Sequence, residues 1–319
     1  MKTVFVINPR AGTGKETEKL ISDVAKSAEI YITKCEGDAT WFVKEYCQKN
    51  GPARFIACGG DGTLSEVLNG LADCTEAQIG VLPKGTGNDF CRNFKMAGDF
   101  ADIKSQLSGG TIKCDAIKYK TVLGGKEVSG YCINMFNIGF DCNVADLTAN
   151  MKKKPFISGP FAYLLSIFAN LIKKKGANLK IEIDDEEFYS GRLLLASIAN
   201  GSYCGGGILS NPLASIYDGL ININVVYNVS RLKFLSLLPH YMKGTHINLA
   251  GIEKVIHNTK CKKVVLTPLD GEMKICIDGE IITAGRTEFE IVPSAVNFVV
   301  PKKYTESKIT EKKNEKQNI

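Results

Sequence analysis

The first third of this 319-residue chain alternates apolar runs typical of β-strands with patterns typical of helices. Strands are predicted at 3–8, 29–33, 54–60 and 78–83, and helices at 15–28, 38–49 and 63–71. This β-α-β-α-β-α-β order predicts a parallel, doubly wound sheet whose strands are joined by crossover helices. Ligands of such sheets bind beyond the carboxyl ends of the strands. The candidate binding loops are those that follow Asn8, Thr33, Cys58 and Pro83.

From about Thr111 the pattern changes to strand-like runs joined by short turns. The segments DDEE (184–187) and DGE (278–280) are turn signals between alternating runs. Helical patterns interrupt the strands near 160–175 and 230–244. The second part of the chain is therefore predicted to be an antiparallel β-domain, a sandwich with a few helices.

Three regions follow from these patterns. The α/β domain is expected to comprise residues 1–113 together with about 295–303, because the strand-like run at 296–301 returns to it. Residues 114–294 form the β-rich domain. The stretch 304–319 is charged and poor in apolar residues, which predicts a disordered or fraying tail.

Composition narrows the classes of partner. The net charge of +6 favours anionic partners: a nucleotide, an acidic lipid surface or a nucleic acid. Nucleic acid is disfavoured, because the basic residues form neither a recognition helix nor an aromatic platform for RNA. The eleven cysteines are odd in number, contain no CxxC pair and stand partly in apolar runs. They are interpreted as buried, reduced thiols of a cytoplasmic protein.

One apolar segment, 155–172, is bracketed by lysines 152–154 and 173–175. Its uncharged centre barely reaches the length of a membrane span and contains a Gly-Pro pair, which argues against a spanning helix. Two interpretations stay open for this segment. It forms a core helix between domains with solvated lysine ends, or its basic ends and apolar middle make shallow contact with a membrane.

Glycines surround Asp61 in the stretch CGGDGTLSEVLNG, Cys58 to Gly70. Thr63 and Glu66 match a capping box, so a helix is expected to start directly after the glycines and to present free N–H groups to an anion. An aspartate there would repel a bare phosphate, but it is favourable when Mg²⁺ lies between the two. The stretch VLPKGTGNDF repeats this arrangement with Asp89. The two loops together suggest that the ligand is a metal–nucleotide complex.

The alternative for each glycine loop alone is an ordinary tight turn, and turns are commoner than active sites. The stretch NPRAGTGKE resembles a Walker loop but lacks its spacing, since Pro9 stands where the first glycine is required and Glu16 replaces Ser or Thr. Residues Asn8 to Gly12 nevertheless close the first strand and remain a candidate nucleotide loop.

The motifs INPRAG, TKCEGDA, GGDGTLSEVLNG, LPKGTGNDFCR, NPLASIYDGL and IDGE occur in the order seen in the diacylglycerol kinase catalytic-domain family. The chain resembles this family from Lys2 to about Pro301. The family includes soluble bacterial lipid kinases and is similar to sphingosine and ceramide kinases. GGDGT alone is shared with NAD kinases and phosphofructokinases, whereas GTGNDF and the later motifs are more specific. The resemblance implies an N-terminal sheet like that of those enzymes and a C-terminal domain that holds the lipid.

The resemblance also implies roles for particular residues. The nucleotide, ATP, would be bound by Asn8, Pro9, Arg10, Ala11, Gly12, Thr33, Gly59, Gly60, Asp61, Gly62, Thr63, Leu64, Ser65 and Thr86. A structural Mg²⁺ would be held by the Asp218 carboxylate and the backbone oxygens of Ser215 and Leu220, which suits a hard cation. Asp61, Asp89 and Asp115 would form a water-linked acidic network around the metal. The proton acceptor maps onto Asp278 and Glu280.

The chemistry supports this assignment independently. Phosphorylation of an alcohol needs in-line approach, neutralisation of charge on the γ-phosphate and an acceptor for the hydroxyl proton. A hairpin that carries two alternate carboxylates can supply that acceptor, and alternation allows Asp278 and Glu280 to face the same side. On pattern alone, DGE is more often an exposed turn, and Asp218-Gly219 is likewise more often a turn than a metal site.

The leading hypothesis is an ATP- and Mg²⁺-dependent lipid kinase that phosphorylates a hydroxyl of diacylglycerol or a related lipid. It would be cytoplasmic and act transiently at the inner face of the membrane. One alternative is a kinase of a soluble metabolite, of the NAD kinase type. The other is a non-catalytic regulator that binds nucleotide or lipid. The sequence leaves the oligomeric state open, a homodimer included.

Overall fold

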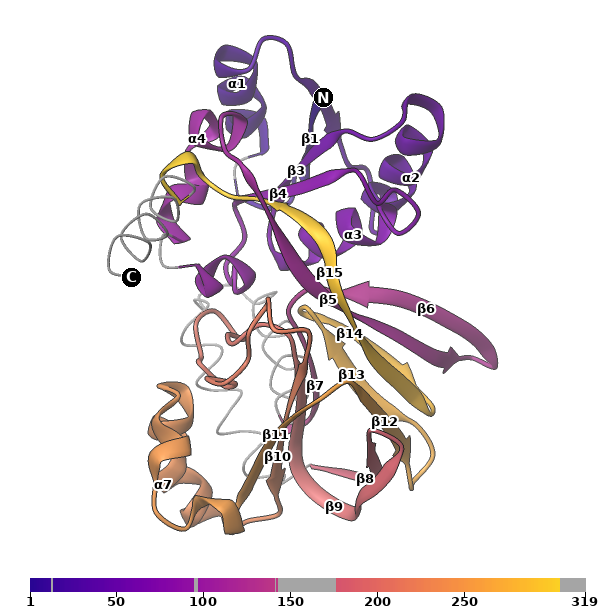
Figure 1. Ribbon diagram of the computed structural model, residues 1–319, viewed down its shortest axis with the longest axis vertical. Helices are drawn as coiled ribbons and strands as arrows, with labels where there is room; N and C mark the ends of the chain where they lie inside the picture. The colour runs from indigo at the N-terminus through magenta and orange to yellow at the C-terminus, as the bar shows by residue number, and fades with distance from the viewer. Residues whose placement is uncertain (13, 95–96, 141, 143–175, 305–319) are drawn as a thin grey trace, which may run out of the picture. The chain divides into compact units, whose positions relative to one another are not determined.

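The computed structural model describes residues 1–12, 14–94, 97–140, 142 and 176–304 (Figure 1). The chain divides into two compact units, Met1–Cys114 with the segment from Ser294 onward, and Asp115–Pro293. The lysine-flanked segment 155–172 and residues 305–319 of the predicted tail lie outside the described residues.

The first unit contains the predicted parallel sheet. Its strands are β1 (Thr3–Ile7), β2 (Glu29–Ile32), β3 (Arg54–Gly59) and β4 (Gln78–Pro83). They pair in the order β2-β1-β3-β4, every pair parallel. The end of β15 (Thr287–Val299) adds to β4, where Asn297 pairs with Gln78. Because all of these strands run the same way, their carboxyl ends lie along one edge of the sheet.

Helices cover both faces of this sheet. They are α1 (Gly14–Val24), α2 (Asp38–Asn50), α3 (Asp61–Gly70) and α4 (Ile103–Leu107), with 3-10 turns at Phe90–Asn93 and Ala97–Ala101. Figure 1 shows α1 and α4 on one side of the strands and α2 and α3 on the other. The apolar side chains of Phe5, Ile56 and Leu82 are fully buried here, as in any doubly wound sheet with two covered faces.

Two predicted helix boundaries are wrong. Helix α1 ends at Val24 rather than residue 28, because Ala28 N–H bonds to Ala25 O in a turn that leads into β2. Helix α3 begins at Asp61 rather than Thr63. The residue before the first helical position is Gly60, which has extended backbone and therefore cannot continue a helix.

The second unit is antiparallel, as predicted. Its strands are β5 (Thr111–Leu123, from Asp115 on), β6 (Lys126–Cys132), β7 (Met135–Gly139), β8 (Ala177–Ile183), β9 (Glu186–Ala199), β10 (Ile221–Tyr227), β11 (Ile256–Cys261), β12 (Lys263–Pro268), β13 (Met273–Ile277), β14 (Glu280–Ala284) and the first part of β15. They pair in the order β14-β13-β7-β9-β8-β12-β15, with β10 between β9 and β11, and β6 beside β5. Helix α7 (Arg231–Met242) and 3-10 turns at Thr245–Asn248 and Ile252–Lys254 join β10 to β11.

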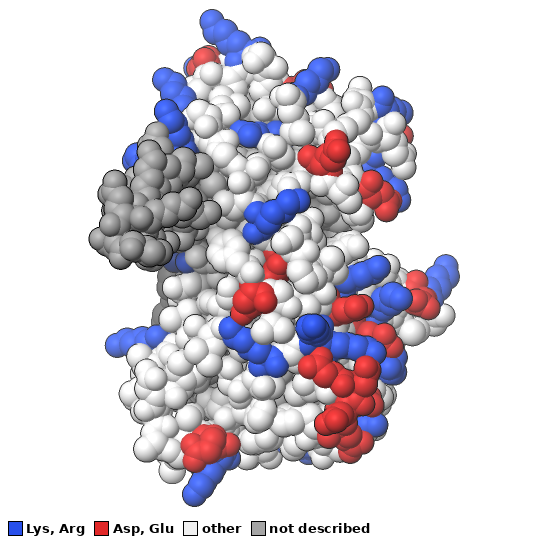
Figure 2. Space-filling view, in the orientation of Figure 1, with Lys and Arg blue, Asp and Glu red and all other residues white. Residues whose placement is uncertain are grey.

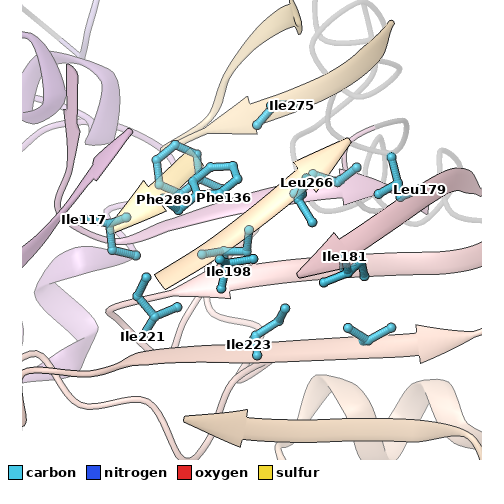
Figure 3. Packing of buried hydrophobic residues seen from close by; sticks show 14 of the residues in the cluster. Ile117, Phe136, Leu179, Ile181, Ile198, Ile221, Ile223, Leu266, Ile275 and Phe289 are labelled. Atoms are coloured by element: carbon cyan, nitrogen blue, oxygen red, sulfur yellow. The ribbon is translucent and has the colours of Figure 1, made fainter. Parts of the chain in front are cut away.

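The core of this unit is formed by alternate residues of its strands. Figure 3 shows Phe136, Ile198 and Phe289 converging from β7, β9 and β15, each with none of its surface exposed. Burial of side chains of this size contributes roughly 1.5–3 kcal/mol each. The two predicted turn signals are two-residue hairpin loops, since Ile183 pairs with Glu186 and Ile277 with Glu280.

Candidate functional site

The predicted binding loops meet at the carboxyl edge of the first unit's sheet. The N–H of Asn8, after β1, donates to Cys58 O at 3.0 Å, and that of Thr33, after β2, donates to Ile7 O at 2.9 Å. The N–H of Lys84, after β4, donates to Gly59 O at 2.8 Å. Four strand ends are therefore joined by hydrogen bonds, and this part of the predicted site is a single cluster of loops.

Asn8 organises the first of these loops. Its Oδ1 accepts the N–H of Arg10 at 2.9 Å, and its backbone oxygen accepts the N–H of Ala11 at 3.1 Å. Its Nδ2 donates to the Thr63 hydroxyl at 3.2 Å, in the second loop. Pro9 and Arg10 are exposed at the tip of the turn. Asparagine at this position thus shapes the loop and fixes it to the start of α3.

Glycines let the second and third loops pack backbone against backbone. A Cβ on Gly85 would lie 2.4 Å from Gly60 Cα, and one on Gly59 would lie 2.2 Å from the Thr63 hydroxyl oxygen. Gly12 has a φ of +67°, and its Cβ would lie 3.3 Å from Lys84 O. Glycine is therefore required for loop packing, in addition to the ligand approach that the sequence suggests.

The predicted capping box is wrong, although a helix does start here. The Thr63 hydroxyl accepts from Asn8, and Glu66 Oε2 accepts the N–H of Ala39 at 3.1 Å instead of closing on its own helix. The first intrahelical bond runs from Leu64 N–H to Gly60 O at 3.1 Å. The helix itself therefore offers no acceptor to the amides before Leu64, and its positive end faces the loops.

Leu64 and Ser65 are buried, with 1% and 8% of their surfaces exposed. Contacts between these two residues and a nucleotide remain a prediction. Thr86 is exposed in the third loop, and the Thr33 hydroxyl donates to Ile7 O at 3.3 Å. The structure thus brings the predicted nucleotide residues of the first unit together; their roles remain predictions.

Asp61 and Asp89 converge on Gly87. A Cβ on Gly87 would lie 2.9 Å from Asp61 Oδ2 and 3.3 Å from Asp89 Oδ2. Asp61 Oδ1 also accepts the N–H of Asp89 at 2.8 Å and that of Phe90 at 3.3 Å. Arg92 Nε lies 3.6 Å from Asp89 Oδ1. Two carboxylate oxygens turned to one small space, against a glycine that leaves room, fit a hydrated divalent cation.

In the second unit, Asp278 occupies the β13–β14 hairpin loop with a φ of +45° and only 7% of its surface exposed. Its Oδ1 accepts the N–H of Met135 at 3.0 Å, and its Oδ2 accepts that of Ile133 at 3.3 Å. The Cys132 thiol lies 3.2 Å from Oδ1. Burial raises the pKa of Asp278 to about 6, and these hydrogen bonds act in the opposite direction.

Glu280 has a different environment, although it is only two residues away. It is exposed at the start of β14, where Ile277 and Glu280 close the hairpin. The two carboxylates of the DGE turn therefore differ in burial, although both act on Tyr119, and a common orientation of the two remains a prediction. Sequence patterns gave no sign of Cys132, because it lies far from Asp278 along the chain.

The predicted metal loop is only partly assembled. Asp115 is tied to it by two bonds, since Asp115 Oδ2 accepts the N–H of Gly219 at 2.7 Å and Asp115 N–H donates to Ile216 O at 2.8 Å. Asp218 Oδ2, however, lies 2.6 Å from the Lys260 ammonium, and its Oδ1 accepts the N–H of Leu220.

This arrangement does not fit a cation at Asp218, Ser215 and Leu220, because a lysine already neutralises the only carboxylate of that set. Among the residues that the structure describes, no three His, Cys, Asp or Glu side chains are grouped to hold a metal. Asp115 belongs to the second unit and Asp61 and Asp89 to the first, so their common acidic network remains a prediction.

Two family models match the chain. The diacylglycerol kinase catalytic domain matches residues 2–119, and the YegS C-terminal NAD kinase beta sandwich-like domain matches residues 134–300. The chain therefore belongs to the diacylglycerol kinase catalytic-domain family, as its motifs indicate.

Relatives agree with this placement. Proteins of Staphylococcus aureus strains MSSA476 and MW2, each named "putative lipid kinase", are 28% identical over 297 residues, 92% of either chain. A crystal structure titled as a "putative diacylglycerol kinase" from Bacillus anthracis has a TM-score of 0.68 at 23% identity, covering 93% of this chain and 96% of that one. A second structure from the same organism has a TM-score of 0.65. At this identity the structures support the fold.

No helix within the described parts of the chain is both long enough and apolar enough to cross a membrane.

Proposed function

We propose that this protein is an ATP- and Mg²⁺-dependent lipid kinase. It transfers the γ-phosphate of ATP to a hydroxyl of diacylglycerol or a related lipid, and the product is phosphatidic acid or its analogue. The observation that carries the proposal is Asp278, a buried carboxylate held by two backbone N–H groups with its pKa raised to about 6, in a chain of this family. A general base works best when its pKa is close to the operating pH.

The loops of the first unit would bind ATP. The amino end of α3 offers backbone N–H groups to phosphate oxygens, and the glycines at 59, 60 and 85 allow the loops around it to pack closely. Asp61 and Asp89 would hold Mg²⁺ through water, and the ion would neutralise charge on the phosphates. Arg92, 3.6 Å from Asp89, would orient that carboxylate.

In the second unit, Asp278 would accept the proton of the lipid hydroxyl. The hydroxyl oxygen forms a bond to the γ-phosphorus, the bond from that phosphorus to the β,γ-bridging oxygen breaks, and ADP leaves. The hydroxyl proton passes to the Asp278 carboxylate. We assign this role to Asp278 rather than Glu280, because the hydrogen bonds from Ile133 and Met135 hold its carboxylate in one orientation. Exposed Glu280 is the alternative acceptor.

A phosphotransfer assay tests this function. Purified protein is incubated with γ-labelled ATP, Mg²⁺ and a panel of diacylglycerol, monoacylglycerol, sphingoid base and isoprenoid alcohol, with NAD in a separate reaction. We expect label in one lipid class and none in NAD. Labelled NADP would instead identify a kinase of a soluble metabolite. An absence of label in every acceptor, while ATP still binds, would leave a non-catalytic regulator.

Asp278→Asn and Glu280→Gln distinguish the two acceptor assignments in the same assay. Asp278→Asn is expected to lower turnover about 10²–10⁴-fold, the usual contribution of a general base. Glu280→Gln is expected to have a smaller effect. Because the substrate is a membrane lipid, the enzyme would act at a membrane surface, and its cytoplasmic location remains a prediction.

A further inference from the structure

The groups that bind the Asp278 carboxylate come from one short connection, residues 132–135 between β6 and β7. Cys132, the last residue of β6, has none of its surface exposed, and its sulfur lies 3.2 Å from Asp278 Oδ1. An ionised carboxylate has no proton to give, so the thiol is the donor. Burial and the nearby Asp278 raise the pKa of Cys132 well above the ordinary thiol value, which keeps this donor protonated at neutral pH.

Within the described part of the chain, no cationic side chain acts on this pair. The other ionisable side chains that interact with Cys132 are Tyr119 from β5 and Cys276 from β13, and Glu280 from β14 interacts with Tyr119. None of these groups is positively charged in any protonation state. The negative charge of Asp278 is therefore stabilised by N–H and S–H dipoles, and Cys132 supplies the side-chain contribution.

We propose that Cys132 is a positioning residue, whose thiol fixes Asp278 Oδ1 and stabilises the ionised carboxylate that accepts the substrate proton. The inference rests on the proposed function of Asp278. It assigns a role to a residue that is absent from every motif of the chain.

The direction of the effect follows from which form the thiol stabilises. Burial raises the pKa of Asp278, and the hydrogen bond from Cys132 lowers it. Removal of the thiol therefore moves the pKa of Asp278 further upward. A larger fraction of the enzyme then carries a protonated, inactive Asp278 at a given pH, so the acid limb of the pH–turnover profile moves to higher pH.

The test compares three variants. Cys132→Ala removes the donor, Cys132→Ser replaces it with a hydroxyl, and Cys261→Ala deletes another buried thiol of the same unit, whose sulfur contacts Ile221 O instead. We expect the acid limb of kcat to rise by about one pH unit in Cys132→Ala, which is roughly a tenfold loss of turnover below the pKa. Cys132→Ser and Cys261→Ala should keep the wild-type limb, and KM for ATP should stay unchanged.

Coincident profiles for Cys132→Ala and wild type would overturn the inference, as would a Cys132→Ser profile displaced to higher pH. The serine result decides the matter alone if the alanine variant does not fold. A readout independent of turnover is the ¹³C titration of the Asp278 carboxyl, assigned by its absence in Asp278→Asn. An upward shift in Cys132→Ala supports the inference even if the proposed kinase activity fails, and an unshifted titration refutes it.

A separate observation concerns helix α7, which has two apolar faces. Phe234, Leu237 and Tyr241 pack inward against the second unit. Leu232, Leu235 and Met242 form a stripe on the outer face, with 81%, 37% and 38% of their surfaces exposed. Their spacing along the helix puts them on one side. An apolar stripe this exposed on a helix already packed on its other face is typical of an interaction surface.

The charged residues of the segment 231–252, which contains α7, all have one sign. Arg231, Lys233 and Lys243 flank the stripe, and no acidic residue occurs between Ser230 and Ile252. In Figure 2 the surface at the lower left, where α7 lies, carries few charged side chains, an acidic one among them, whereas side chains of both signs crowd the surface over β8, β9 and β12 at the lower right. Cations beside exposed leucines complement an anionic lipid surface.

We infer that the outer face of α7, defined by Leu232, Leu235 and Met242, docks on an anionic bilayer, with Arg231, Lys233 and Lys243 at the headgroups. The inference rests on the proposed lipid substrate, since only such a substrate requires the protein to reach a bilayer. It is independent of the lysine-flanked segment 155–172.

Co-sedimentation with vesicles of phosphatidylcholine, with and without phosphatidylglycerol, tests this surface. The double variant Leu232→Ser/Leu235→Ser is expected to lower partitioning onto the anionic vesicles about tenfold. The matched control is Leu269→Ser, because Leu269 is also an exposed leucine, with 46% of its surface exposed, but stands beside the acidic Asp270. This variant should bind the vesicles as wild type does. Lys233→Glu/Lys243→Glu should weaken binding to the anionic vesicles only.

Unchanged partitioning of the leucine variant would overturn the inference. Sedimentation velocity tests the alternative that a second copy of the chain covers this face. A wild-type dimer that becomes a monomer in the leucine variant, while vesicle binding is retained, would establish that alternative. Turnover on a dispersed short-chain diacylglycerol separates this result from the proposed function. The leucine variant should keep that turnover, whereas its absence in wild type would refute the kinase proposal and leave the vesicle result standing.

Discussion

At the scale of residues, two aspartates show how surroundings give one side chain different properties. Asp61 lies at the start of α3, where its Oδ1 accepts two backbone N–H groups and its Oδ2 lies beside Gly87. Asp278 also accepts two backbone N–H groups, but it is buried, and the loss of hydration outweighs the hydrogen bonds. The first carboxylate suits a cation, and the second suits proton transfer.

The raised pKa of Asp278 predicts the pH dependence of turnover. Because the carboxyl must be ionised to accept a proton, kcat should fall as the pH drops through about 6. Because the pKa of Asp278 is higher in the folded protein than its ordinary value of 3.8, protonation of this carboxyl stabilises the fold. The contribution is fully present below pH 3.8 and is lost as the pH rises through about 6. Measurement of kcat from pH 4.5 to 8 at saturating substrate checks the first statement. An acid limb near pH 4 would contradict it.

The close approach of Gly60 and Gly85 predicts a position that tolerates no side chain. Gly85→Ala would place Cβ at 2.4 Å from Gly60 Cα, which forces the two loops apart. We expect a loss of about 1–3 kcal/mol in the free energy of unfolding, with weaker ATP binding. Gly98→Ala is the control, because its Cβ would meet nothing within 4 Å. Urea unfolding and calorimetric titration with ATP give both quantities, and equal behaviour of the two variants would contradict the prediction.

At the scale of elements, the β13–β14 hairpin sets the position of Asp278. Its two loop residues, Asp278 and Gly279, both have positive φ, at +45° and +99°. This pair of conformations matches the twist of the flanking strands, and aspartate followed by glycine adopts it readily. The same loop geometry recurs between β8 and β9 with Asp184 and Asp185, where Asp184 Oδ1 accepts the N–H groups of Lys262 and Lys263.

Gly279→Ala is predicted to disturb turnover as well as stability. Alanine in this backbone conformation costs about 1–2 kcal/mol, although no atom lies within 4 Å of its Cβ. The matched control is Gly125→Ala in the β5–β6 hairpin, where φ is +79° and the space is equally open. Both variants should lose similar stability in urea, and only Gly279→Ala should lower kcat. A normal kcat in a folded Gly279→Ala enzyme would show that Asp278 does not depend on this loop.

At the scale of the whole molecule, each unit has its own core and its own part of the candidate site. Phe5, Ile56 and Leu82 belong to the core of the first unit, which carries the glycine loops. Phe136, Ile198 and Phe289 belong to that of the second unit, which carries Asp278. The proposed phosphotransfer would require both sets of residues, so loss of either core is expected to abolish it.

The Asp218–Lys260 pair predicts that the second unit needs no metal for its stability. In the absence of nucleotide, a chelator should leave the thermal midpoint of the protein unchanged. Lys260→Met should lower the free energy of unfolding by roughly 0.5–1 kcal/mol, the usual value of a partly exposed pair, and should make the midpoint rise on addition of Mg²⁺. Differential scanning calorimetry measures these shifts. A wild-type midpoint that falls on chelation would restore the metal site at Asp218.

Much of the architecture was predictable, because its signals are local. The periodicity of residues 3–83 predicted four parallel strands and three helices, and the structure confirms them with shifted ends. Helix ends were less predictable. Thr63 and Glu66 were expected to cap α3, but their side chains bond instead to Asn8 and to the N–H of Ala39, which lie elsewhere in the chain. The metal loop was predicted without Lys260, which lies 42 residues beyond Asp218 in the chain.

Residue order was thus sufficient for the succession of strands and helices, the glycine positions and the membership in a lipid kinase family, because periodicity and motifs are properties of neighbouring residues. Only the tertiary structure decided which carboxylates have a perturbed pKa. The partners of Asp278 lie 143 to 146 residues before it, and only the pairing of β7 with β13 brings them within hydrogen-bonding distance. Burial and distance determine a pKa, and neither exists until distant segments pack together.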